Sequence, residues 1–210
     1  MKLENYLNLF FFETFIFDFD GTLFLSNDIK KEGFYYCASC YPNGNKVMKF
    51  ILENSIQKDR YSIFKIFSRI ISNKKLSEVS LYKKLIVDYH NFTLENICKL
   101  KPITGSLELL KKLKRKDKFL FINSATPYSS LNEIMRKLEI FHYFDGIFGM
   151  EASKLENLKK IKEESHSNKR FMIMIGDGID DKQAATQFKI DFLPVGQLLT
   201  KSYPNYSRFI

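Results

Sequence analysis

The chain has 210 residues, and its 33 lysines and arginines against 24 aspartates and glutamates give a formal charge of +9. An apolar content of 45% is ordinary for a packed core, so intrinsic disorder is excluded for most of the chain. No stretch approaches the ~20 uninterrupted apolar residues of a membrane span, and the apolar run at 9–19 lacks the marks of a secretory signal. We therefore expect a soluble, cytoplasmic protein with no membrane partner.

The positive charge is mostly dispersed along the chain. Its densest run, at 111–116, is interleaved with leucines as on an amphipathic helix, and such a run is usually a solvated helix face. We therefore expect no nucleic-acid partner, although a positive protein attracts small anionic substrates. A basic nucleic-acid-binding module or a non-catalytic module stays open as the non-enzyme alternative.

The three cysteines are too few for a disulfide framework and favour a reducing compartment. Cys37 and Cys40 have the spacing of a zinc hairpin or a redox pair. A zinc site would need two further ligands, and only Cys98 and His90 are plausible nearby. We interpret the pair as ordinary small buried side chains.

In chain order, the first expected element is an apolar strand at 15–18 that ends in an acid. Residues 25–100 then place apolar residues at helical spacing without strand-like alternation, which predicts a helical domain. The periodic positions are Val47, Phe50 and Ile51, then Ile63, Phe64, Phe67, Ile70 and Ile71, then Tyr82, Leu85, Ile86 and Tyr89. This helical domain separates the first strand from the remaining strands.

Residues 101–210 alternate short apolar runs with amphipathic helical patterns, which is typical of βα units on a parallel sheet. The expected strands are 119–123, 147–149, 171–175 and 192–195. One of the helices has its predicted N-cap at Thr126, with Pro127 in its first turn. The sequence predicts an α/β fold, a Rossmann-like parallel sheet core of 1–24 and 101–210 with a helical cap at 25–100 inserted after the first strand.

Two carboxylates, Asp18 and Asp20, stand at the end of the first strand. Ligands bind at the carboxyl ends of strands in open α/β sheets, and burying one unpartnered acid there would cost several kcal/mol. The pair therefore suggests a cation or a catalytic role, and Gly21 lets the chain turn sharply beside a ligand. Taken alone, the motif is equally compatible with an acidic turn cap.

A second acidic cluster follows the apolar run at 171–175 and contains Asp177, Asp180 and Asp181. Two acid-bearing loops after two parallel strands can converge on one hard cation, because Mg²⁺ takes oxygen ligands. The sequence therefore predicts Mg²⁺ as cofactor.

An anion site is expected between these two clusters in the chain. Ser124 and Ala125 lead from a strand to a helix N-terminus, where backbone N–H groups and a hydroxyl can bind an anion. Lys154 opens the next expected helix and adds a positive charge. Acids that can bind Mg²⁺, together with donors that can bind an oxyanion, predict a site that binds and transfers phosphate.

These motifs resemble the haloacid dehalogenase superfamily of Mg²⁺-dependent phosphohydrolases. The matching residues, in order, are Asp18, Asp20, Gly21 and Thr22, then Ser124, then Lys154, then Gly176, Asp177, Gly178, Asp180 and Asp181. The resemblance covers 12–24 and 101–195. The segments at 124–127 and 143–149 are similar to the phosphoglycolate phosphatase-like branch, in which a helical cap follows the first motif.

The resemblance implies the catalytic roles. Asp18 is the nucleophile that forms an aspartyl-phosphate. Asp20 protonates the leaving oxygen and then activates the hydrolytic water. Ser124 and Lys154 hold the phosphoryl oxygens, and Gly21 and Ala125 complete the phosphate-binding loops.

The resemblance also implies the metal ligands. The Asp18 carboxylate, the Asp20 backbone carbonyl and Asp177 hold Mg²⁺, and Asp181 lies at the second-acid spacing of the family. Whether Asp180 or Asp181 supports the metal is open at this point. Lys154 is followed by Leu155 where the family commonly has proline.

The expected activity is hydrolysis of a small-molecule phosphomonoester, with a small anionic phosphorylated metabolite as the binding partner. Phosphoryl transfer, as in sugar-phosphate mutases, and phosphonate cleavage are the alternatives on the same fold. The cap is expected to close over the site and select the substrate.

Overall fold

The computed structural model describes residues 11–56, 59–73 and 77–195. These residues form two compact units. One unit holds the described part of 1–25 and 101–210, and the other holds that of 26–100. In the described residues, no helix is long and apolar enough to cross a membrane.

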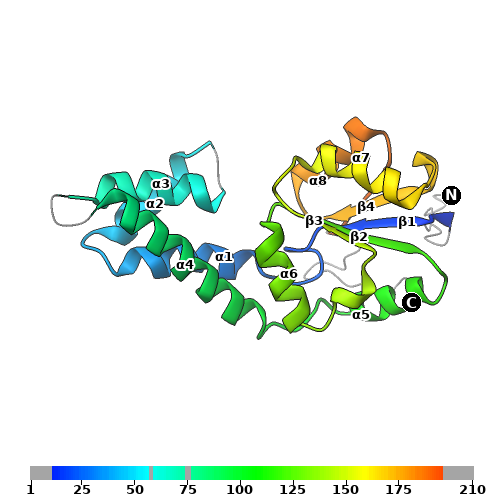
Figure 1. The fold of residues 1–210 in the computed structure, drawn as a ribbon, viewed down its shortest axis with the longest axis horizontal. Coiled ribbons are helices and arrows are strands. Elements are labelled where there is room, and N and C mark those ends of the chain that lie inside the picture. The colour runs from blue at the N-terminus through cyan, green and yellow to red at the C-terminus, as the bar shows by residue number, and fades with distance from the viewer. Residues whose placement is uncertain (1–10, 57–58, 74–76, 196–210) are drawn as a thin grey trace, which may run out of the picture. The chain divides into compact units, whose positions relative to one another are not determined.

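The first unit is built on a five-stranded sheet with the order β3-β2-β1-β4-β5, and every paired strand in it is parallel (Figure 1). The strands are β1 (Thr14–Phe17), β2 (Phe119–Asn123), β3 (Gly146–Phe148), β4 (Met172–Gly176) and β5 (Asp191–Pro194). The predicted α/β fold with a parallel sheet is confirmed. The expected strands differ from the observed ones by at most one residue at each end, because an apolar run marks burial and not the first ladder hydrogen bond.

Four helices of this unit cover the two faces of the sheet. The helices α7 (Lys154–Ser165) and α8 (Ile179–Phe188) lie on one face, and α5 (Ser106–Lys114) and α6 (Tyr128–Lys137) on the other (Figure 1). The strands β1 and β4 are buried throughout, as near-continuous apolar runs predict. Two short 3₁₀ turns, Phe141–Tyr143 and Lys169–Phe171, precede β3 and β4.

The register of the sheet brings the ends of three strands level with one another. Phe17, the last residue of β1, pairs with Ile122 of β2 on one side and Ile175 of β4 on the other. The backbone N–H of Asp18 also donates to the Ile175 carbonyl at 2.9 Å. The loops that follow β1, β2 and β4 therefore begin at one edge of the sheet.

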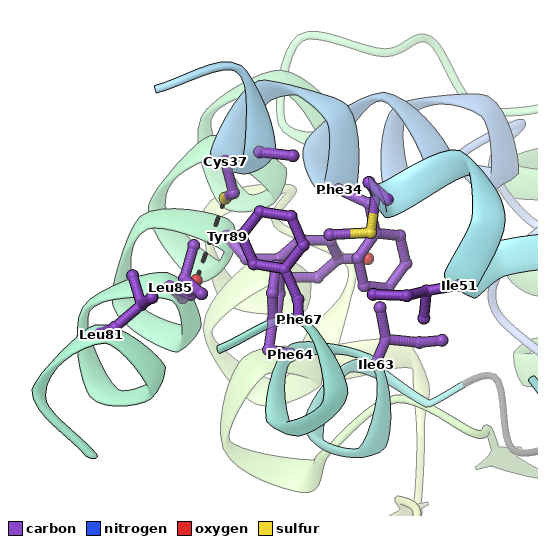
Figure 2. Packing of buried hydrophobic residues seen from close by; sticks show 11 residues of the cluster. Phe34, Cys37, Ile51, Ile63, Phe64, Phe67, Leu81, Leu85 and Tyr89 are labelled. Atoms are coloured by element: carbon purple, nitrogen blue, oxygen red, sulfur yellow. Dashed lines mark hydrogen bonds between the residues drawn. The ribbon is translucent and has the colours of Figure 1, made fainter. Parts of the chain in front are cut away.

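The second unit consists, in its described residues, of the helices α1 (Asn27–Ser39), α2 (Gly44–Asn54), α3 (Arg60–Ile71) and α4 (Glu78–Ile97). Each helix directs apolar residues into a common interior in which aromatic rings meet (Figure 2). The Phe34 ring lies 4.7 Å from the Tyr89 ring and 5.2 Å from the Phe64 ring, measured between centroids. Most of the helical-period residues thus form or border a core of this unit, whereas Phe50 and Ile70 are exposed.

The cysteine pair is divided between interior and surface. Cys37 is buried in α1, and its Sγ lies 3.9 Å from the Leu85 carbonyl oxygen of α4 (Figure 2). Burial raises the pKa of the Cys37 thiol to about 12. Cys40 is exposed, so the expectation of two buried side chains is correct for Cys37 and wrong for Cys40. A high thiol pKa leaves Cys37 a poor nucleophile and metal ligand.

Candidate active site

Three carboxylates converge at the common strand edge of the first unit. Asp18 directly follows β1, Asp177 follows β4, and Asp181 lies in the first turn of α8. One carboxylate oxygen from each lies within 4.8 Å of the others. Asp18 and Asp181 are buried and Asp177 is exposed. Two of the carboxylates are therefore enclosed by the protein, and the third is accessible to solvent. Such a donor set fits a hard divalent cation that keeps part of its water shell.

Lys154 contacts two of these three acids, Asp18 and Asp181. Lys154 is the first residue of α7, whose N-terminus is fixed by a capping box between Ser153 and Glu156. Its Nζ lies 3.4 Å from Asp18 Oδ1 and also contacts Asp181 Oδ1. The expected position of Lys154 at a helix start is thus observed, and the side chain reaches the acids.

The two neighbouring acids of α8 differ in environment. The Asp181 side chain is fully buried, and its Oδ2 accepts from the Gly178 backbone N–H at 3.0 Å. The Asp180 side chain is 57% exposed and pairs with Lys154 at 2.9 Å. Gly176 lets Asp181 approach, because a Cβ at Gly176 would collide with the Asp181 carboxyl group. Asp181, and not Asp180, therefore stands in the three-carboxylate group.

The charges at this site shift one another's pKa values. The pKa of Asp18 is raised to about 8, mainly by burial; the charge of Lys154 opposes this change, and the neighbouring Asp181 and Asp20 add to it. Burial also raises the pKa of Asp181, against the opposing charge of Lys154. For Lys154, burial lowers the pKa but the charges of Asp18, Asp181 and Asp180 outweigh it, so the pKa is raised. A bound cation would oppose these shifts, because its charge favours the ionised form of the acids.

Asp20 is not one of the three grouped carboxylates, and its side chain bonds to a different partner. It is buried, and its Oδ2 accepts a hydrogen bond of 2.9 Å from Thr126 Oγ1. The following residue, Gly21, has φ 72°, a left-handed conformation that glycine adopts without strain, and its N–H donates to the Phe24 carbonyl at 2.7 Å. The chain therefore turns sharply directly after the two acids.

The prediction that Thr126 caps α6 is wrong, because Pro127 is the N-cap residue. The Thr126 side chain turns toward Asp20 instead, so sequence reasoning missed a residue of the site. The one available signal was a hydroxyl residue two positions after Ser124. A threonine directly before a helix is equally compatible with an N-cap and with a hydrogen-bond donor to an acid.

The proposed anion-binding residues lie at the end of β2. Ser124 is buried, its N–H donates to the Phe148 carbonyl at 3.0 Å, and its Oγ accepts from the Thr126 N–H at 3.2 Å. Ala125 is exposed. Ser124, Ala125 and Lys154 all line one cavity of about 320 Å³ in the first unit. The other lining residues are Met150, Ala152, Ser153, Leu155, Asp180, Gln183, Ala184 and Gln187.

Two buried asparagines, which the sequence analysis did not single out, hold the Lys154 backbone. The Asn123 side-chain amide donates to the Lys154 carbonyl at 3.0 Å. The Asn157 amide donates to Asn123 Oδ1 at 3.0 Å and to the Gly149 carbonyl at 2.9 Å. An asparagine at the end of an apolar strand was the visible signal, since a buried amide requires partners.

Comparisons with known proteins identify relatives of this arrangement. A family model described as haloacid dehalogenase-like hydrolase matches residues 15–195. A solved structure named as a beta-phosphoglucomutase of Thermotoga maritima is 21% identical with a TM-score of 0.71 and covers 90% of this chain and 88% of its own. A predicted phosphoglycolate phosphatase of Haemophilus somnus is 18% identical with a TM-score of 0.69 and covers 94% and 88%. These structures share the fold of the chain.

A curated protein, the tryptophan synthase alpha chain of Pelagibacter ubique, is 31% identical over 173 residues. The match covers 73% of this chain and 64% of that protein, so the chain spans less than two thirds of the length of this relative. The family model, by contrast, extends over the acids, the hydroxyl residues and the lysine of the site.

Proposed function

The chain belongs to the haloacid dehalogenase-like hydrolases, and we propose that it hydrolyses phosphomonoesters with Asp18 as nucleophile. One observation carries the proposal. Asp18, Asp177 and Asp181 bring carboxylate oxygens within 4.8 Å of one another, and the Lys154 ammonium group lies 3.4 Å from Asp18. Acids able to hold a cation, next to a buried lysine, suit a substrate that is itself an anion.

Asp18 would attack phosphorus in line with the leaving oxygen. The new bond joins Asp18 to phosphorus while the bond from phosphorus to the alcohol oxygen breaks, which gives an aspartyl-phosphate. Asp20 would give the departing oxygen a proton in this step and take a proton from water in the next. The water then displaces phosphate from Asp18, so both side chains return to their initial protonation states.

Ser124, Ala125 and Lys154 would bind the phosphoryl oxygens. The raised pKa keeps Lys154 cationic, and Ser124 lines the same cavity as Lys154. Donors that are fixed before the reaction stabilise charge as it moves onto these oxygens in the transition state. The two asparagines contribute indirectly, because they hold the Lys154 main chain in place.

Mg²⁺ is the cofactor that this donor set fits best. It would screen the repulsion between the ionised nucleophile and the anionic substrate. Asp18, Asp177 and Asp181 offer carboxylate oxygens for it, and the family resemblance adds the Asp20 backbone carbonyl. Asp180 would serve the site through its ion pair with Lys154.

A small phosphorylated metabolite is the proposed substrate, and residues 26–100 would act as the cap that selects it. A cap formed by a separately packed helical unit can change its substrate contacts without disturbing the acids of the sheet. Phosphoryl transfer between two positions of a sugar is the alternative on this fold, and it differs in releasing little inorganic phosphate.

The test is phosphate release by the purified chain from p-nitrophenyl phosphate and a panel of metabolite phosphates, with and without Mg²⁺. We expect turnover that requires Mg²⁺ and that falls on the order of 10³-fold or more in Asp18→Asn. Asp117→Asn is the matched control, because Asp117 is exposed and has φ 55°, a conformation that asparagine tolerates.

The outcomes separate the candidate functions. No activity on any substrate, or near-wild-type activity in Asp18→Asn, would overturn the hydrolase proposal. Isomerisation of a sugar phosphate with little phosphate release would establish the mutase alternative. Binding of nucleic acid that falls steeply with salt, without turnover, would favour the non-enzyme alternative.

A further inference from the structure

We propose that Thr126 is a positioning residue for Asp20, and that its hydroxyl fixes the carboxyl group which the proposed function uses as acid and base. Thr126 Oγ1 donates to Asp20 Oδ2 at 2.9 Å, across 106 positions of the chain. Thr126 is 1% exposed and Asp20 is 8% exposed, so little solvent competes for this bond. The inference rests on the proposed function, and it assigns a task to a residue for which the sequence predicted only a helix cap.

The Thr126 main chain is held from both sides. Its N–H donates to Ser124 Oγ at 3.2 Å, and its carbonyl accepts from the Met150 N–H at 3.1 Å. Two residues later, the Tyr128 N–H donates to Glu151 Oε1 at 2.9 Å. The loop after β2 is therefore tied to the loop after β3, and the Thr126 side chain is presented from a fixed backbone.

Gly149 allows this close approach of the two loops. A Cβ at Gly149 would lie 2.5 Å from the Tyr128 nitrogen and 2.8 Å from the Thr126 carbonyl oxygen, both of which are backbone atoms. Because neither atom can move as a side chain would, a larger residue here would displace Thr126. The loop pair is thus built so that the Thr126 hydroxyl reaches Asp20.

A fixed carboxyl group matters because proton transfer requires hydrogen-bond geometry to the leaving oxygen. An aspartate that rotates between staggered conformations spends part of its time turned away from that oxygen, and small misplacements reduce rates strongly. The effect should depend on the leaving group. A nitrophenolate departs without needing a proton, whereas an alkyl alkoxide requires one, so only the alkyl ester should register the loss of positioning.

The experiment compares kcat/KM for p-nitrophenyl phosphate with that for an alkyl phosphate such as glycerol 1-phosphate, in wild type, Thr126→Val and Thr126→Ser. Thr126→Val should reduce kcat/KM for the alkyl ester by about 10–100-fold and for the aryl ester by less than about 3-fold. Thr126→Ser should keep the wild-type ratio, since it retains the hydroxyl. If Thr126→Val does not fold, Thr126→Ala is measured in its place.

Three further variants test whether Thr126 acts through Asp20. Asp20→Asn should show the same selective loss to a greater degree, and adding Thr126→Val to it should reduce the rate no further. Thr93→Val is the control for a buried threonine, because Thr93 is 2% exposed and its hydroxyl bonds to the Tyr89 carbonyl within α4.

Equal losses on both esters in Thr126→Val, or additive losses in the double variant, would overturn the positioning role while leaving the hydrolase proposal intact. A wild-type protein without activity on either ester would instead refute the proposed function itself.

Discussion

The two units of the protein bury charge in contrasting ways. The first unit buries Asp18, Asp20 and Asp181, and Lys154 contacts two of them, Asp18 and Asp181. Among the described residues of the second unit, Arg60 is the buried charged residue, and its guanidinium lies 4.9 Å from the centroid of the Tyr89 ring. Like charges are costly to bury together, so three buried acids at one edge of the sheet indicate a functional site. A cation that lies against an aromatic ring indicates a structural contact instead.

Each unit also has an apolar core of its own. The second unit is held by one cluster of apolar and aromatic side chains from all four helices, in which Phe64 and Phe67 are fully buried. The first unit has a cluster of buried apolar side chains from the sheet and from α7 and α8, and Phe121 and Met174 belong to it. Two separate cores mean that each unit can be weakened without direct loss of contacts in the other.

The strongest test of this separation is Phe64→Ala. Phe64 is fully buried, so its removal leaves a cavity and should lower the free energy of unfolding of the helical unit by about 3–5 kcal/mol. Hydrogen exchange should accelerate in α1–α4 and stay at its wild-type rate in β1, β2 and β4. Phe50→Ala is the matched control, because Phe50 is 62% exposed and its loss should change stability little. Equal acceleration in both units would show that the cores are coupled.

A smaller effect is expected for Lys154→Met, which tests the charged side of the comparison. Its removal leaves Asp18 and Asp181 buried without their cation, so the free energy of unfolding should fall by about 3 kcal/mol. Activity should also be lost, because the substrate loses a charge partner. Chemical denaturation and phosphate release measure the two effects.

Lys114→Met is the control for losing a lysine from an ion pair. Lys114 contacts Asp145 at 2.7 Å, but both side chains are about one third exposed. A solvated pair of this kind contributes roughly 0–1 kcal/mol. If the two lysine variants lost equal stability, burial would not distinguish the site from an ordinary surface pair.

Much of the first unit was predictable from sequence because burial leaves a direct mark on it. Strands covered on both faces must be apolar, which located β1, β2 and β4 to within one residue. The convergence of Asp18 with Asp177 followed from parallel strands whose carboxyl ends share one edge of the sheet. Lys154 at the start of α7 was also visible.

The remaining features depend on side-chain direction, which local sequence does not encode. Thr126 has the chemistry of an N-cap, yet tertiary contact turns its hydroxyl to Asp20. The choice between Asp180 and Asp181 depends on which of two adjacent residues faces inward from α8, a difference of about 100° around the helix axis. Asn157, buried in α7, became significant only once its partners were placed.

The smallest predicted effect concerns a helix end in the second unit, where a charge contributes to stability without any catalytic use. Asp59 caps α3, and its Oδ1 accepts from the Tyr61 and Ser62 N–H groups at 3.0 Å each. Partial burial would raise the pKa of Asp59, but the hydrogen bonds from Ser62 and Tyr61 outweigh it and lower the pKa. A lowered pKa stabilises the fold at pH values above the unfolded-state pKa, and this contribution is lost as the pH falls through the folded-state pKa.

Asp59→Ala should therefore lower the free energy of unfolding by about 1 kcal/mol at neutral pH and by progressively less below about pH 4. Ser77→Ala is the control, because Ser77 occupies the N-cap of α4 without a side-chain capping bond. Denaturant unfolding from pH 3 to 7 measures the free energy of unfolding of both variants. A loss of stability in Asp59→Ala that does not change with pH would contradict a contribution from the carboxylate charge.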